Sequence, residues 1–241
     1  VLEALCDRRE EVGTNLPLPE LFVARGWATP AERDELLVEA HRRLDRAAAT
    51  PTRASGDAPT LAGDAPRAFR AEYRIPPDHR LVSVVGRLHR AKGQQVVLQA
   101  APQALSRLPA LTFLFVGEGE ERGTLEAMAR TLGVSGAVRM PGFTSDVGSV
   151  YRQSDVVLIP SLSDAFPYSA LEAMHYGCAI VASDVDGLCE IFTHERNALL
   201  VPPGDPDALA AALLRRLGDG ALREALGRQA AEDVKRFSLE E

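Results

Sequence analysis

Six short apolar segments, separated by longer stretches, constrain the fold of this chain more than any other feature. Each is rich in Val, Ile, Leu or Phe and is followed by Gly, Pro or Ser. The segments are LVSVV (81–85), LTFLFV (111–116), AVRM (137–140), DVVLIP (155–160), AIVA (179–182) and ALLV (198–201). Helical patterns such as QQVVLQAAPQAL and DPDALAAALLRRL lie between or after them. Near-continuous apolar strands that alternate with helices predict a parallel sheet covered on both faces, a doubly wound, Rossmann-like α/β domain.

A segment rich in proline and glycine precedes this pattern. Residues 50–67 carry three prolines and two glycines but almost no large apolar side chain, so we expect a linker there. Before it, TPAERDELLVEAHRRLDRAAA (29–49) has a Thr29 cap and an apolar stripe, which predict an amphipathic helix. The predicted organisation is therefore a helical N-terminal segment (1–49), a linker (50–67) and a Rossmann-like domain (68–241).

Charge and cysteine content exclude several classes of function. The formal charge of −7 argues against a nucleic-acid binder, because such proteins need clustered Lys and Arg. The three cysteines lack metal-ligand spacing, so we expect no metal and reduced thiols. No apolar run approaches the roughly 18 residues of a membrane span, and no targeting pattern opens the chain. We expect a cytoplasmic protein without a transmembrane segment, and peripheral membrane contact is left open.

The first strand is followed by a basic loop. In doubly wound sheets ligands bind beyond the carboxyl ends of the strands, so these loops are where a site is expected. GRLHRAKG (86–93) places Arg87 and Lys92 around the turn, and Gly86 and Gly93 allow close backbone approach. This arrangement suits a diphosphate, although two solvated loop cations would give the same pattern.

The second strand is followed by VGEGEER, which superficially suggests a dinucleotide-binding loop. Its glycines do not have G-x-G-x-x-G spacing, and its three glutamates would repel a pyrophosphate. A nicotinamide-dependent oxidoreductase is therefore disfavoured. Gly117 is expected to let the backbone turn tightly beneath a nucleoside.

The fourth strand leads into a loop and a helix that together carry two carboxylates. The helix is expected to begin at Pro167 or Tyr168, so that the amides of Tyr168 and Ser169 can face an anion. Asp164 before the helix and Glu172 inside it can accept hydrogen bonds from hydroxyl groups. Amides for a phosphate and carboxylates for sugars on either side predict a nucleotide diphosphate sugar as ligand. Ordinary helix capping by the two acids is the simpler alternative.

Five motifs occur together in one order: GRLHRAKG, LFVGEGEER, MPGFTSDV, IPSLSDAFPYSALEAMHYG and VASDVDGLCE. In order and spacing, residues 68–238 resemble the retaining glycosyltransferases of the GT-B fold, group 1 (family 4). The resemblance implies that Arg87 and Lys92 bind the diphosphate of a sugar donor, that Asp164 contacts the donor sugar and that Glu172 contacts the ribose. It implies four catalytic residues: Arg87, Lys92, Asp164 and Glu172. The implied substrate-binding residues are Gly86, Gly117, Met140, Phe166, Pro167, Tyr168 and Ser169. It also implies that neither a metal nor another cofactor is needed.

Three departures from the family pattern affect what we expect. Asp164 stands where the family usually has Glu, and Asp186 stands where Gly is common. Residues 1–67 are too few for the N-terminal Rossmann domain that binds the acceptor, and the chain ends at RFSLEE, before the usual crossing helix. We therefore expect half of an active site, completed by an N-terminal Rossmann domain in cis or in trans. A non-catalytic nucleotide-sugar-binding or regulatory module is the alternative hypothesis, and the base, sugar and acceptor are left open.

Overall fold

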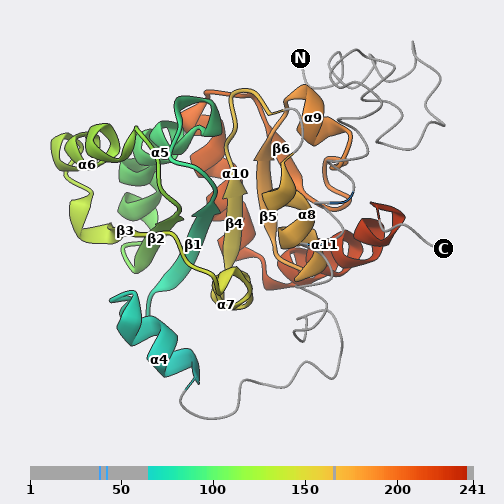
Figure 1. Ribbon diagram of the computed structural model, residues 1–241, viewed down its shortest axis with the longest axis horizontal. Helices are drawn as coiled ribbons and strands as arrows, with labels where there is room; N and C mark the ends of the chain where they lie inside the picture. The colour runs from blue at the N-terminus through green and yellow to red at the C-terminus, as the bar shows by residue number, and fades with distance from the viewer. Residues whose placement is uncertain (1–37, 39–41, 43–64, 165–166, 238–241) are drawn as a thin grey trace.

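The computed structural model describes residues 38, 42, 65–164 and 167–237, and these contain one six-stranded parallel sheet (Figure 1). The strand order is β3-β2-β1-β4-β5-β6, so the order reverses between β1 and β4. The strands are β1 (Arg80–Val85), β2 (Leu111–Val116), β3 (Val138–Gly142), β4 (Val156–Ile159), β5 (Ile180–Ser183) and β6 (Leu199–Val201). The predicted doubly wound α/β fold is confirmed, with each strand within two residues of its apolar segment.

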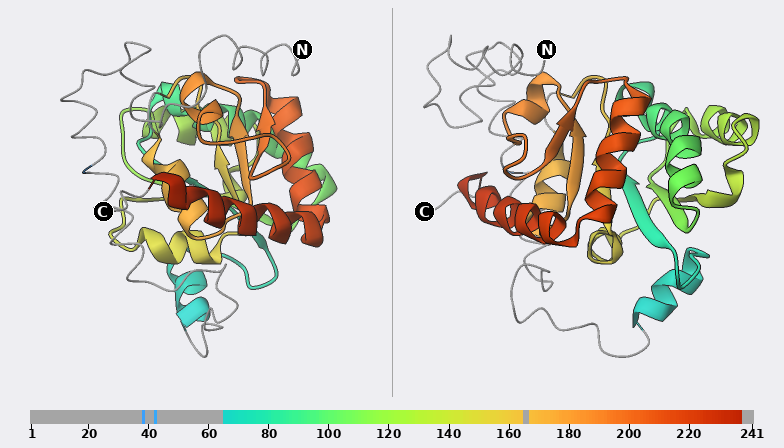
Figure 2. Two further views of the ribbon diagram at one scale, coloured as in Figure 1. Left: turned by 90° about the vertical axis from the view of Figure 1, so that its right-hand side faces the viewer. Right: turned by 180° about the vertical axis from the view of Figure 1, so that it is seen from behind.

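Helices cover both faces of the sheet. They are α4 (Ala65–Glu72), α5 (Gln94–Arg107), α6 (Arg122–Thr131), α7 (Val147–Gln153), α8 (Tyr168–His175), α9 (Asp186–Cys189), α10 (Pro206–Gly218) and α11 (Gly220–Asp233), with short 3-10 turns η2 (Arg90–Lys92), η3 (Ser135–Ala137) and η4 (Val234–Phe237). One core joins α5, α6 and α10 to one face, and two others join α4, α7 and α8 to the opposite face (Figure 2). No helix in the described ranges is long and apolar enough to cross a membrane.

The strands show why the apolar segments are continuous. In β2, Phe113 and Phe115 belong to the core under α5, whereas Leu114 and Val116 belong to the core under α4. All six residues of β2 are buried. Burying a side chain of this size stabilises the fold by roughly 1.5–3 kcal/mol, so both faces of the strand must be apolar.

The linker prediction needs a correction at its end. Helix α4 begins at Ala65, so residues 65–67 are helical and not linker. The cause is the apolar side of this helix, where Phe69 and the following Tyr73 are buried with ring centroids 4.6 Å apart. Residues 50–64 and, apart from Val38 and Arg42, the predicted N-terminal helical segment lie outside the described residues, so those predictions stand untested.

Candidate functional site

The loops at the carboxyl ends of β1, β2 and β3 are joined by backbone hydrogen bonds. The amide of Gly86 donates to Val116 O and that of Gly117 donates to Gly142 O, each at 2.9 Å. Gly117 has φ 143°, and a Cβ there would lie 2.1 Å from Gly86 O. Glycine is therefore required where these two strands end. The backbone bends at Gly117, and its expected place beneath a nucleoside stays a prediction.

The loop after β1 is also seated against the loop after β4. The amide of Leu162 donates to Ala91 O at 2.7 Å. Gly93 has φ 73°, and a Cβ there would lie 1.8 Å from Pro160 O. This close approach brings the basic turn after β1 next to the acidic loop before α8.

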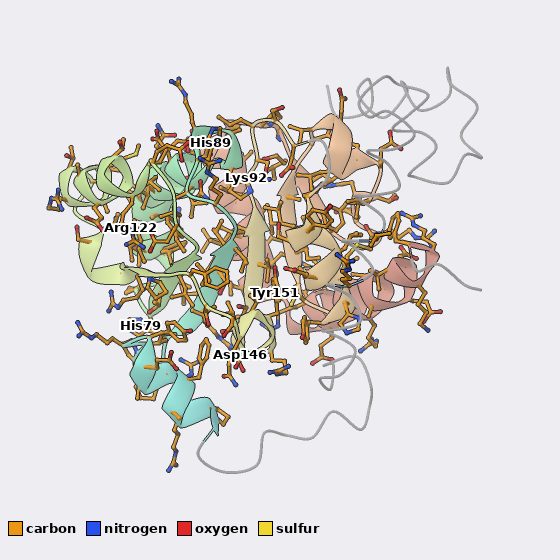
Figure 3. All side chains as sticks on the ribbon, viewed as in Figure 1. His79, His89, Lys92, Arg122, Asp146 and Tyr151 are labelled. Carbon is orange, nitrogen blue, oxygen red and sulfur yellow. The ribbon has the colours of Figure 1, made fainter. Side chains whose placement is uncertain are left out.

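Lys92 and Asp164 meet at this junction. The Nζ of Lys92 lies 2.5 Å from Oδ2 of Asp164, and the hydroxyl of Ser161 donates to the same oxygen at 3.0 Å. The side chain of Asp164 is 7% exposed and that of Lys92 is 34% exposed. Figure 3 labels Lys92 and His89 at the carboxyl-terminal ends of the strands, and the amide of Lys92 donates to His89 O at 2.9 Å. A mostly buried carboxylate is thus neutralised by a cation that solvent can still reach.

Arg87 has a different partner. Its Nη2 lies 3.1 Å from Oε2 of Glu120, which follows β2, and its side chain is 69% exposed. Nε2 of His89 lies 3.5 Å from the other oxygen of Glu120. The pKa of the Glu120 carboxyl is lowered, first by a hydrogen bond from its own backbone and also by the nearby charge of Arg87. An exposed pair of this kind is weak because solvent screens it, so an anion could displace Glu120.

Glu172 lies on α8 and is held by an aromatic hydroxyl. The OH of Tyr151 on α7 donates to Oε2 of Glu172 at 2.9 Å and lies 3.4 Å from Ser169 O. Tyr151 is fully buried and its ring stacks on Tyr176 with centroids 5.6 Å apart. Sequence reasoning did not select Tyr151, although a tyrosine just before the fourth apolar segment is a visible signal.

A cavity of about 460 Å³ opens beside Asp164. It is lined by residues 162–164 of the β4–α8 loop, by residues 184–185 between β5 and α9, and by residues 186–187 at the start of α9. Asp184 accepts a hydrogen bond from the Cys189 thiol. The cavity was not predicted from the sequence, and neither was the part that Asp184 plays in its wall.

Most of the remaining residues that we predicted to bind substrate lie at or near the carboxyl-terminal ends of the strands. Helix α8 begins at Tyr168, and Pro167 precedes it in an extended conformation without a side-chain cap. Met140 is partly buried on β3, where its backbone oxygen accepts a hydrogen bond from Arg122 at 2.9 Å. Phe166 lies outside the described residues. Among the residues that the structure describes, no group of His, Cys, Asp and Glu is placed to hold a metal ion.

The four residues predicted to be catalytic are only partly brought together. The structure joins Lys92 to Asp164 directly and sets both beside the cavity. Arg87 is paired with Glu120 and Glu172 accepts from Tyr151. The arrangement offers cations for an anionic group and carboxylates for hydroxyl groups at one edge of the sheet.

Comparison with known proteins gives a consistent set of relatives. A profile described as "Glycosyl transferases group 1" matches residues 67–233. D-inositol 3-phosphate glycosyltransferase of Corynebacterium urealyticum is 37% identical over 180 residues, which cover 71% of this chain and 42% of the relative. The chain thus spans about two fifths of the length of that relative.

Two solved structures share the fold. Sucrose-phosphate synthase of Thermosynechococcus elongatus has a TM-score of 0.64 and 31% identity, covering 71% of this chain and 44% of its own. The Anabaena protein HepE, solved in complex with UDP-glucose, has a TM-score of 0.67 and 25% identity, covering 71% and 48%.

Proposed function

The chain belongs to the group 1 glycosyl transferases, and from this premise we propose that it binds a nucleotide diphosphate sugar and forms the donor-binding half of a retaining glycosyltransferase. The observation that carries the proposal is the pairing of Lys92 with Asp164 at 2.5 Å beside a cavity of about 460 Å³. A cation for the diphosphate and a carboxylate for the sugar then stand side by side, as a ligand with these two parts requires.

Lys92 and Arg87 serve the diphosphate. In the reaction the bond between the anomeric carbon and the phosphate oxygen breaks, and its electron pair leaves with the nucleotide. The acceptor oxygen forms the new bond to the anomeric carbon, and its proton passes to the departing phosphate oxygen. Fixed cations stabilise this charge more in the transition state than in the ground state, which accelerates the step. Arg87 reaches the diphosphate by leaving Glu120, since that pair is exposed and weak.

The two acids serve hydroxyl groups on either side of the diphosphate. Asp164 accepts hydrogen bonds from the donor sugar in the cavity, and Glu172 accepts them from the ribose. Tyr151 is the residue that orients Glu172, because its buried hydroxyl donates to Oε2 at 2.9 Å. Met140 and the backbone near Tyr168 and Ser169 complete the nucleotide and phosphate contacts.

A second Rossmann domain, in cis or in trans, supplies the acceptor side. The complex of HepE with UDP-glucose supports a nucleotide diphosphate sugar as the donor class. The acceptor is unassigned, and the name of the Corynebacterium relative describes that protein alone.

Calorimetric titration with UDP and GDP tests the proposal. Wild-type protein should bind at least one of them, Lys92→Ala should abolish binding, and Glu172→Ala should weaken it about tenfold, the equivalent of one charge-assisted hydrogen bond. Arg107→Ala is the matched control, because it removes an equally positive, exposed side chain in the last turn of α5. Wild-type affinity in both site variants, or no binding of either nucleotide, would refute the proposal.

Retention is tested on the released sugar. Full-length protein given UDP-α-glucose or GDP-α-mannose should first release or transfer the α-anomer, observed by proton NMR before mutarotation. First appearance of the β-anomer would show inversion. Donor binding without hydrolysis or transfer would favour the non-catalytic module.

A further inference from the structure

The cavity beside Asp164 has an acidic wall. Asp164 comes from the β4–α8 loop, Asp184 from the β5–α9 loop and Asp186 from the first position of α9. The other lining residues are Leu162, Ser163, Val185 and Gly187, so none of the lining side chains is basic. Lys92, through its pair with Asp164, is the cation that approaches from the rim.

The three carboxylates differ in the hydrogen-bond and ion-pair partners that the structure gives them. Asp164 is held by Lys92 and by the Ser161 hydroxyl. Oδ1 of Asp184 accepts a hydrogen bond from the Cys189 thiol, while Oδ2 is buried without a hydrogen-bond partner in the described structure. Because this oxygen is buried, Asp184 contributes its negative charge to the cavity wall and not an oxygen that a ligand in the cavity contacts.

Asp186 is exposed on the rim of the cavity, at the first position of α9. The described structure gives it neither a salt bridge nor a side-chain hydrogen bond, so its charge is available to whatever enters. When a diphosphate occupies Lys92, the charge of Asp164 also loses part of its compensation. The filled cavity would then present a surplus of negative charge.

We propose that the sugar accepted by this cavity is uncharged, and that Asp186 is a specificity-determining residue that repels donors whose sugar carries a carboxylate. The inference rests on the proposed function, since it concerns the sugar of the same ligand. Hydroxyl groups donate to carboxylates, whereas a uronic acid places a like charge against Asp186 and cannot donate from its carboxylate. The relevant donor class is a nucleotide diphosphate hexose and not a nucleotide diphosphate uronic acid.

Matched ligand pairs test this directly. UDP-glucose and UDP-glucuronic acid differ only at C6, as do GDP-mannose and GDP-mannuronic acid. Calorimetry on wild-type protein should give a Kd for the acid about tenfold or more above that for the neutral sugar, in the series whose base binds. Asp186→Asn should shrink this ratio at least about threefold, and about 0.5 M salt should also reduce it.

Asp78→Asn is the matched control, because it removes the same charge from an exposed residue just before β1, at the amino-terminal ends of the strands and away from the cavity. Its ratio should equal that of wild type. A wild-type ratio near one, or an unchanged ratio in Asp186→Asn, overturns the inference while binding of free UDP or GDP leaves the proposed function standing. If neither free nucleotide binds, the proposed function fails and the inference fails with it.

Discussion

Replacing Asp164 by Asn should make the protein bind a free nucleotide diphosphate more tightly. In the ligand-free structure the Nζ of Lys92 is 2.5 Å from the Asp164 carboxylate. If Lys92 serves the diphosphate, UDP or GDP must compete with that carboxylate. The Asn side chain keeps the shape and can still accept from Ser161, but it removes the competing charge.

The magnitude follows from the exposure of the pair. Exposed ion pairs contribute about 0–1 kcal/mol, and pairs in a low-dielectric interior contribute more. With Asp164 7% exposed and Lys92 34% exposed, the pair lies between these cases, at about 1 kcal/mol. Releasing Lys92 should therefore tighten binding of the free nucleotide about fivefold. A sugar nucleotide would also lose a charge-assisted hydrogen bond of about 1.5–3 kcal/mol, so its net affinity should fall.

The assay is a pair of calorimetric titrations, with UDP and UDP-glucose or with GDP and GDP-mannose. Asp164→Asn should lower the Kd of the free nucleotide and raise that of the sugar nucleotide, while Asp78→Asn changes neither. Weaker binding of the free nucleotide by Asp164→Asn would refute the reasoning, since it would mean that Asp164 does not compete with the nucleotide for Lys92. Equal changes in the Kd of both ligands would mean that Asp164 does not contact the donor sugar.

Two further predictions concern stability, measured by urea unfolding. Gly93→Ala should lower the free energy of unfolding by more than about 3 kcal/mol or prevent folding, because its Cβ would lie 1.8 Å from Pro160 O at φ 73°. Gly123→Ala in α6 is the control: its Cβ would meet no other part of the chain within 4 Å, so it should be neutral or stabilising by up to about 1 kcal/mol. Similar losses in both variants would contradict the prediction. Burial alone would raise the pKa of Asp233, but hydrogen bonds, first from Arg196, outweigh it and lower that pKa below its ordinary value of 3.8. Because the pKa is lowered in the folded state, the ionised carboxylate stabilises the fold above pH 3.8, and this stabilisation is lost as the pH falls through the folded-state pKa. Asp233→Asn should therefore cost about 1–3 kcal/mol at about pH 7 and progressively less below pH 3.8. A cost that does not change with pH would count against this prediction.

The sheet could be predicted because its strands are buried on both faces. That burial demands uninterrupted apolar segments such as LTFLFV, which cannot be mistaken for the amphipathic helices around them. Helix α4 escaped prediction because the two buried aromatic residues that pack it, Phe69 inside the helix and Tyr73 just after it, adjoin a stretch rich in proline and alanine. Their packing against Leu81 and Leu114 is a tertiary effect that local composition does not reveal.

The candidate site was predictable in its loops and less so in its contacts. Lys92 and Asp164 follow neighbouring strands, and parallel strands bring their carboxyl ends to one edge, so their meeting could be expected. The partners of Arg87 and Glu172 could not be expected in the same way. Glu120 reaches Arg87 through the conformation of two turns, and Tyr151 reaches Glu172 through the packing of α7 on α8.

The carboxyl edge is built from backbone-to-backbone contacts at Gly86, Gly93 and Gly117, whereas the segment at 184–187 joins the cavity from a separate loop. A framework held by main-chain atoms does not depend on which side chains the neighbouring loop carries. If the proposed function holds, grafting a different tetrapeptide at 184–187 should change the preference for the donor sugar and leave the affinity for the free nucleotide diphosphate unchanged. Under that proposal, the preference for the sugar can change in evolution without any change in the loops that bind the diphosphate.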